Sequence, residues 1–237
     1  MNIINNVFCI LLLLIGVTHT SAQINEVTSP NKNITLNTNL NDGKLFYSVT
    51  LNDKPVIHYS RLGIESKTGA FKGKMVITGS SESTLNETWE PVWGDFNKYR
   101  NHYNQLIIDL EESDAKKRKM QVVVRAYNDG IAFRYIFPEQ KNLKEVNITK
   151  EHTSVSVISE DPIAWYAASS TTLHNHKSFN EITDKCRTPF TIQAAENCFI
   201  SLHEAAVVNS TDARLTMGAD KRTLTFSGAM KTSTRKG

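Results

Sequence analysis

The stretch Cys198-Phe-Ile-Ser-Leu-His-Glu-Ala-Ala206 contains a carboxylate whose position needs a chemical explanation. Its first residues alternate like a β-strand, with Cys198, Ile200 and Leu202 on one face. Continuing this register places Glu204 on the apolar face, where a carboxylate needs a proton, hydrogen bonds or a cation. Glu204 is therefore either a strand-end acid turned back to solvent or an oxygen ligand for a hard cation such as calcium. One carboxylate cannot make a calcium site, so the other ligands must come from elsewhere.

A second group of side chains could bind a sugar. The run Thr88-Trp-Glu-Pro-Val-Trp-Gly-Asp95 is followed closely by Lys98-Tyr-Arg-Asn-His-Tyr-Asn104. Trp89 and Trp93 could stack on the C–H face of a pyranose, while polar groups such as His102 read its hydroxyls. The alternative, which the sequence favours, is a long loop that its aromatic residues pack over a sheet.

Other catalytic and metal-binding patterns are weak. His174 and His176 would share one face of a strand and could bind a metal, but their polar neighbours indicate a loop and no third ligand is near. The sequence has no Gly-x-Ser-x-Gly nucleophile motif and no nucleotide-binding glycine loop. Nothing in it singles out a pair of carboxylates for glycoside hydrolysis.

The N-terminus predicts export. A short apolar core, Val7 to Val17, precedes Thr20-Ser-Ala22, which indicates a signal peptide over residues 1–22 with cleavage after Ala22. The apolar run is too short to span a bilayer comfortably, so we expect no membrane span after cleavage and a periplasmic or secreted protein. Residues 23–237 show no linker or repeat and are expected to form one domain.

The charge distribution argues against a nucleic-acid partner, and the cysteine content leaves one possible disulfide. The chain has 27 basic and 24 acidic residues, and its main basic cluster, Lys116 to Lys119, follows Glu111-Glu-Ser-Asp114. A solvated hairpin turn explains these charges better than a nucleic-acid surface, which needs basic residues spread over one face. After cleavage Cys186 and Cys198 remain, and the sequence leaves open whether they pair or are ordinary thiols.

Strand patterns recur along the mature chain. Residues 45–51, 120–126 and 131–137 alternate between apolar and polar, and the last two runs flank Asn128-Asp-Gly130, which favours a hairpin turn. No window after the signal peptide shows a convincing helical stripe. Many short strands separated by turn residues predict an all-β protein, with two large packed sheets more probable than a small barrel.

Several stretches together resemble one known family, and they do so in order and over most of the mature chain. They are Trp89-Glu-Pro-Val-Trp-Gly94, Tyr99-Arg-Asn-His-Tyr-Asn104, Val124-Arg-Ala-Tyr-Asn-Asp-Gly-Ile-Ala-Phe-Arg-Tyr135, Arg187-Thr-Pro-Phe-Thr191 and Leu202-His-Glu-Ala-Ala206. They resemble the N-terminal domain of glycoside hydrolase family 97. The resemblance implies a β-supersandwich similar to the galactose-mutarotase-like fold, in agreement with the strand pattern.

The resemblance also implies a function. Members of this family are secreted α-glucosidases or α-galactosidases in which a catalytic (β/α)8 barrel follows this domain. A calcium ion lies at their active site, and the match to the Glu-Ala element makes Glu204 one of its ligands. The sequence stops at Gly237, where the connection to the barrel is expected, so we expect a domain that buttresses a missing or separately encoded barrel and is inactive alone.

Two alternatives compete with this interpretation. One is a stand-alone carbohydrate-binding module of the same fold, with Trp89, Trp93 and Trp165 as stacking platforms for an α-linked glucoside or galactoside. The other is a mutarotase-like epimerase, which needs a His/Glu acid–base pair in one cleft. His203 and Glu204 point to opposite faces of their predicted strand, so this adjacent pair cannot supply it.

Overall fold

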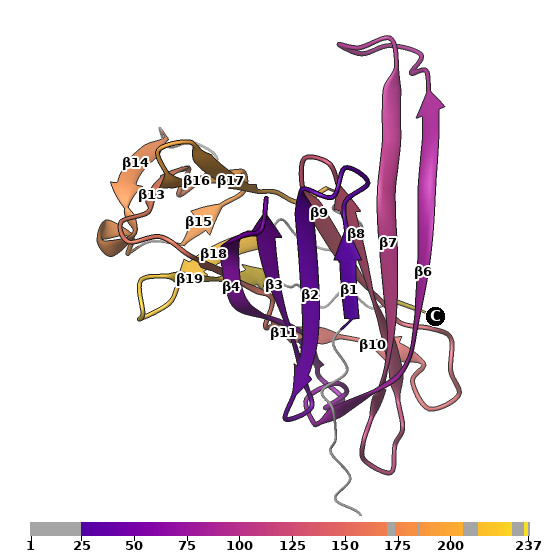
Figure 1. The fold of residues 1–237 in the computed structure, drawn as a ribbon. Helices are drawn as coiled ribbons and strands as arrows, with labels where there is room; N and C mark the ends of the chain where they lie inside the picture. The colour runs from indigo at the N-terminus through magenta and orange to yellow at the C-terminus, as the bar shows by residue number, and fades with distance from the viewer. Residues whose placement is uncertain (1–24, 170–173, 184, 206–212, 229–234, 237) are drawn as a thin grey trace, which may run out of the picture.

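The computed structural model describes residues 25–169, 174–183, 185–205, 213–228 and 235–236 (Figure 1). The predicted signal peptide lies outside the described residues. Antiparallel strands dominate the described part, which confirms the all-β prediction, and the helical structure in that part is a 3-10 turn at Phe179–Glu181. None of the helical structure in these ranges is long and apolar enough to cross a membrane.

Three main sheets form the fold. The eight-stranded sheet has the order β1 (Asn25–Thr28), β2 (Ile34–Asn41), β3 (Lys44–Leu51), β4 (Lys54–Leu62), β12 (Ser154–Val157), β19 (Thr223–Gly228), β18 (Ala213–Met217) and β15 (Cys186–Arg187). The hairpin sheet has the order β6 (Met75–Trp89), β7 (Tyr99–Glu112), β8 (Lys119–Tyr127) and β9 (Ile131–Ile136). The small sheet has the order β14 (Asn175–Ser178), β13 (Ile163–Tyr166), β16 (Phe190–Ala195) and β17 (Cys198–Leu202). Two short pairs join β5 (Ile64–Ser66) to β11 (Ile148–Glu151) and β10 (Glu145–Val146) to β20 (Arg235–Lys236).

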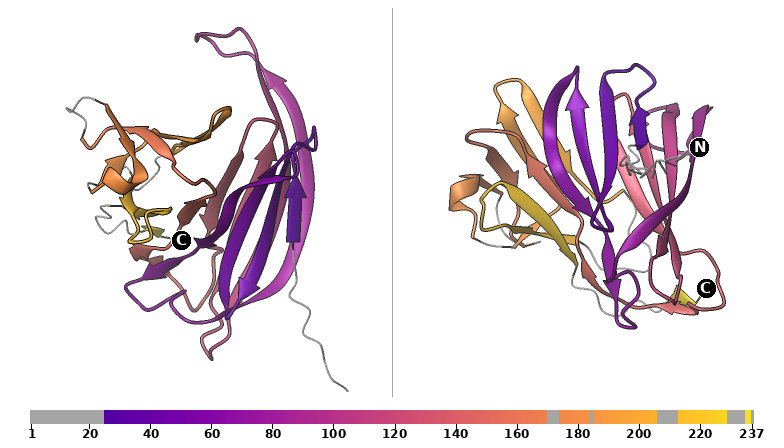
Figure 2. Two further views of the ribbon diagram at one scale, coloured as in Figure 1. Left: turned by 60° about the vertical axis from the view of Figure 1, so that its left-hand side comes forward. Right: turned by 60° about the horizontal axis from the view of Figure 1, so that its bottom comes forward.

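One hydrophobic core joins the three sheets. The hairpin sheet lies beside the β1–β4 half of the eight-stranded sheet, and the small sheet lies beside its β15 and β18 end (Figures 1 and 2). Between the first two, the Tyr47 and Phe133 rings lie 5.9 Å apart. Within the eight-stranded sheet, the Tyr47 hydroxyl of β3 donates to the Ser154 carbonyl of β12 at 2.9 Å. The apolar faces of all three sheets contribute to the same cluster of buried side chains. The predicted β-sandwich class is therefore confirmed.

Turn chemistry sets the register of the hairpins. Asn52 and Asp53 connect β3 to β4 with φ angles of 50° and 62°, as a two-residue turn of this kind requires. At the next predicted hairpin, the N–H of Tyr127 donates to the carbonyl of Gly130 at 2.8 Å, and Ala126 pairs with Ile131. The prediction of a β8–β9 hairpin is confirmed.

The segment favoured as a long loop is a loop at residues 90–98, which form the tip of a long hairpin. Thr88 and Trp89 lie in β6 and Tyr99–Asn104 in β7, so the expectation was wrong for both ends of the segment. Pairing between β6 and β7 continues to Trp89 and Tyr99, and the hairpin extends beyond the other strands (Figures 1 and 2). Polar side chains link its strands: Thr84 Oγ1 donates to Asn104 Oδ1 at 2.8 Å. The outer half of β6 is exposed on both faces, so it lacks the apolar alternation by which a strand is recognised.

The two cysteines of the described chain belong to different sheets. Cys186 is buried in β15, and Cys198 is half-buried at the start of β17. The structure has no disulfide bond between them. The sequence left open whether the two cysteines pair or are ordinary thiols, and in the structure they are thiols.

Candidate functional site

Glu204 follows shortly after β17, which ends at Leu202. The strand keeps the predicted register, because Ile200 and Leu202 pack against the core while Phe199 is exposed. Glu204 is half-buried, and its Oε2 accepts a hydrogen bond of 2.7 Å from the backbone N–H of Ala213, the first residue of β18. The carboxylate therefore lies where the small sheet connects to the eight-stranded sheet, beyond the strand whose apolar face it was expected to share.

A second carboxyl group, that of Glu151, interacts with Glu204. Glu151 is the last residue of β11, shortly before the chain enters β12 beside β19. Burial raises the pKa of the Glu151 carboxyl, a hydrogen bond with Thr153 lowers it, and the negative charge of Glu204 raises it further. A cation near both groups would remove the repulsion between them.

These two acids do not by themselves make a calcium site. Calcium takes about six to eight oxygen ligands, and carboxylates are among its preferred donors. Among the described residues, no three His, Cys, Asp or Glu side chains lie close enough together to hold a metal ion. Carboxylate oxygens such as those of Glu204 and Glu151 are suitable calcium donors. Two carboxylates are too few to fill the coordination shell, so a calcium ion here would need further ligands from outside the described residues.

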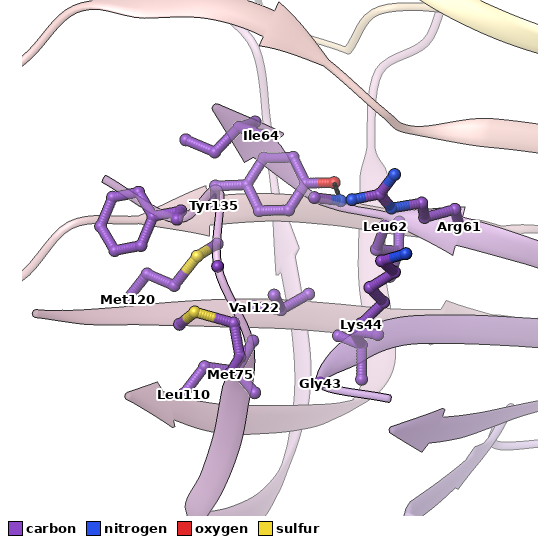
Figure 3. Close-up of a pocket in the computed structure, with 14 residues that line it drawn as sticks. Gly43, Lys44, Arg61, Leu62, Ile64, Met75, Leu110, Met120, Val122 and Tyr135 are labelled. Atoms are coloured by element: carbon purple, nitrogen blue, oxygen red, sulfur yellow. Dashed lines mark hydrogen bonds between the residues drawn. The ribbon is translucent and has the colours of Figure 1, made fainter. Parts of the chain in front are cut away.

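A pocket lies between the eight-stranded sheet and the hairpin sheet, lined mainly by apolar side chains (Figure 3). The Tyr135 hydroxyl at its wall accepts from the Gly63 N–H at 2.8 Å and hydrogen-bonds the Thr153 hydroxyl at 2.7 Å. Arg61 also lines the pocket, and its buried Nε makes no hydrogen bond in the described structure. The enclosed space holds about one water molecule, which excludes it as a sugar site.

Of the proposed sugar-binding side chains, Trp89, Trp93 and His102 belong to the long hairpin, whereas Trp165 lies in β13 of the small sheet. Trp89 ends β6 and stacks on Tyr99, with ring centroids 4.9 Å apart. Trp93 lies in the hairpin tip, residues 90–98, and is 88% exposed. His102 pairs with Asn86 further down the hairpin.

The structure does not bring these three side chains together. Trp89 lies three positions after Asn86 in β6, so the two side chains point to opposite faces of the hairpin. Because His102 is the cross-strand partner of Asn86, it lies on the face opposite Trp89. The Nδ1 of His102 is buried and makes no hydrogen bond in the described structure. A single sugar unit cannot contact both Trp89 and His102.

Comparison with known proteins assigns the chain to a family. Residues 27–235 match the family model described as glycosyl-hydrolase 97 N-terminal. The chain belongs to this family. The earlier resemblance is thereby confirmed, and the match covers all three main sheets of the family 97 domain described above.

Solved structures agree with this assignment. A glycoside hydrolase family 97 enzyme from Pseudoalteromonas sp. strain K8, solved in complex with panose and with acarbose, superposes with a TM-score of 0.83 at 25% identity. The match covers 90% of this chain and 34% of that one. A β-arabinopyranosidase shares the fold, with a TM-score of 0.77 at 19% identity over 86% of this chain.

A curated relative is the "Retaining alpha-galactosidase" of Bacteroides thetaiotaomicron. It is 26% identical over 127 residues, which are 53% of this chain and 18% of that protein. This family 97 chain therefore matches about a third of the solved relatives and less than a fifth of the curated one.

Sequence reasoning singled out Glu204 as a candidate calcium ligand and gave no attention to Glu151. Nothing in the stretch Ile148–Glu151 distinguishes this acid from the other acids of the chain. Its burial and its interaction with Glu204 arise from the pairing of β11 with β5 and from the return of the chain through β18 and β19. These are tertiary features of the family 97 domain with no local sequence signal.

Proposed function

We propose that the chain forms the N-terminal domain of a secreted family 97 glycoside hydrolase that acts on α-linked glucosides or galactosides. The observation that carries this proposal is the family match over residues 27–235. A relative of the same fold has been solved with panose and acarbose, and another is named as an α-galactosidase, which supports the substrate class. Export rests on the predicted signal peptide.

In this function Glu204 provides one calcium ligand and a catalytic barrel provides the others. The position of Glu204 supports this role. Glu204 is half-buried, its carboxylate accepts a hydrogen bond from the Ala213 N–H, and its negative charge contributes to the raised pKa of Glu151. When bound, calcium would hold carboxylates from both domains in fixed positions and balance their charge. Glu204 would supply one of these carboxylates, held in place by the hydrogen bond from the Ala213 N–H.

The hairpin tip supplies a surface for the barrel. Val92, Trp93 and Phe96 are all strongly exposed there, at 101%, 88% and 65%. Apolar groups gathered at the end of a projecting hairpin gain free energy when another protein surface covers them. Contact between the tip and the barrel would let this domain buttress the enzyme.

The first test is catalysis by the chain alone. We expect no hydrolysis of nitrophenyl α-glucoside or nitrophenyl α-galactoside, because the proposed catalytic groups belong to the barrel. Release of nitrophenol is followed over hours with the Pseudoalteromonas enzyme as the positive control. Turnover that co-purifies with the chain and disappears in a variant of one of its own acids would contradict the proposal.

A further inference from the structure

The small sheet turns an aromatic and polar face to solvent. Its strands pair in register, so that alternate residues form two rows across the sheet. The first row is His176, Trp165, Thr191 and Ser201, and the second is Ser178, Ile163, Gln193 and Phe199. We call these two rows the aromatic face. His174 and His176 had been assigned to a polar loop, but His176 belongs to strand β14.

Three rings of the aromatic face, two from the first row and one from the second, neighbour one another across the sheet. The rings of His176 and Trp165 are stacked, with centroids 4.6 Å apart and planes 19° apart. The Phe199 ring lies on the other side of Trp165, with centroids 6.2 Å apart and planes 43° apart. His176 is exposed and Phe199 is 59% exposed, so both ends of the ring series are open to a ligand.

Apart from the His176 and Trp165 rings, the polar groups of the two rows are hydroxyls and an amide. None of the side chains in the two rows is Asp, Glu, Lys or Arg, in a chain of which 22% is charged. Thr191 Oγ1 and Ser201 Oγ lie 3.1 Å apart beside the rings, and Gln193 lies in the second row. Carboxylates border the face at Ser178, whose Oγ donates to Asp161 Oδ1 at 3.1 Å and whose N–H donates to Glu181 Oε2 at 3.0 Å. These negative charges disfavour an anion, a nucleic acid or an anionic membrane as the ligand.

The sheet beneath the face is rigid. The opposite sides of the same strands carry Ala164, Tyr166, Phe190 and Ile192, which are fully buried in the core. A planar array of rings and hydroxyls on a packed sheet is ordered before a ligand arrives, so binding costs little conformational entropy. A low entropic cost matters most for a ligand that makes few strong contacts and therefore binds with low affinity.

We propose that the aromatic face binds an α-linked oligosaccharide of glucose or galactose. The C–H faces of the sugar rings pack on the exposed rings of Phe199 and His176, and the sugar hydroxyls bond to the Thr191, Ser201 and Gln193 side chains. The linkage and sugar type rest on the proposed function, whereas the neutral aromatic chemistry rests on the structure. Strand β17 carries Phe199 and Ser201 and leads on to Glu204, so a bound chain lies next to the proposed calcium site.

The test is titration of the full chain with maltoheptaose, panose and raffinose, followed by calorimetry. We expect dissociation constants of about 1 mM for at least one of these sugars. Phe199→Ala and His176→Ala should each weaken binding about tenfold. Both side chains are exposed, so the fold should survive, and circular dichroism checks this. Tyr59→Ala is the matched control, because Tyr59 is a ring of similar exposure at 57% on β4, away from both candidate sugar surfaces, and it should bind like the wild type. Trp89→Ala tests the hairpin separately.

Each outcome decides the proposal. No binding of any of the three sugars by the wild-type chain overturns it, as does binding that Phe199→Ala and His176→Ala leave unchanged. Loss of binding in Trp89→Ala alone would place the site on the hairpin. The titration is repeated with EGTA, which should change nothing, so failure of the aromatic face is distinguishable from failure of the calcium role.

Discussion

Replacing Glu112 by glutamine should lower the free energy of unfolding by about 3 kcal/mol. Glu112 and Arg118 are joined by a salt bridge whose side chains are only 2% and 5% exposed. Arg118 Nη2 donates to Glu112 Oε1 at 2.8 Å, and its Nε donates to Oε2. Glutamine removes the negative charge and leaves the guanidinium buried without a counter-charge, which costs more than the pair itself contributes.

The same pair holds the loop that leads into β6. Glu112 Oε1 also accepts from the Phe71 N–H at 2.7 Å, and Arg118 Nη2 donates to the Gly69 carbonyl at 3.1 Å. Phe71 has a φ of 63°, an unfavourable value for a residue with a large side chain, and its ring stacks on Phe137 at 5.5 Å. We therefore expect the loss of Glu112 to loosen this loop as well.

Urea and thermal denaturation of the full chain measure the effect. The matched control is Lys98→Ala, which breaks the exposed salt bridge to Glu90 and should change the unfolding free energy by less than about 0.5 kcal/mol. Replacing the pair together, Glu112→Leu with Arg118→Met, should recover much of the loss, because no charge then remains buried. A loss below about 1 kcal/mol in Glu112→Gln would show that the guanidinium finds another partner or water.

This pair also marks a limit of sequence reasoning. The sequence predicted a solvated turn between Glu111 and Lys119, and Asp114, Lys116 and Lys117 are indeed exposed. Arg118 and Glu112 were wrongly included in that solvated group, because both are buried. Local charge patterning cannot distinguish them, since their burial depends on the loop at Gly69 and Phe71, which is distant in sequence.

Prediction succeeded where the physics is local. The alternation in β3, β8 and β9 and the Asn128–Gly130 turn act within a few residues, and the structure confirms them. The outer half of β6 has no buried face, so that strand left no apolar period to detect. The aromatic face was missed for another reason: its rings come from three strands, and only the order β14–β13–β16–β17 brings them together.

The candidate site divides in the same way. Glu204 was found because a carboxylate after an apolar alternation is unusual, whatever the fold around it. The grouping of Trp89, Trp93 and His102 failed because closeness in sequence was taken for closeness in space, although an antiparallel hairpin places alternate residues on opposite faces. Residue types indicated sugar-binding chemistry, whereas the strand register determines which of these side chains lie on the same face of the hairpin.

In a complete enzyme, Glu204→Gln should lower kcat/KM at least about hundredfold. A suitable test protein is a chimera in which this chain replaces the matching 34% of the Pseudoalteromonas enzyme. Glutamine can still accept the hydrogen bond from the Ala213 N–H, so the local fold is kept while the charge on the ligand oxygen is lost. Activity on nitrophenyl α-glucoside is measured over a series of calcium concentrations buffered with EGTA.

The calcium series separates a ligand from a structural residue. If Glu204 binds the ion, the variant needs a much higher calcium concentration than the parent chimera, and excess calcium restores part of the activity. Calcium should also raise the melting temperature of the parent more than that of the variant, since an ion stabilises the folded state that binds it more tightly. Glu196→Gln, an exposed acid in the β16–β17 turn, is the matched control and should leave both responses unchanged. Equal calcium dependence of the parent and Glu204→Gln would refute the ligand role, because a bound carboxylate cannot lose its charge without weakening the ion's affinity.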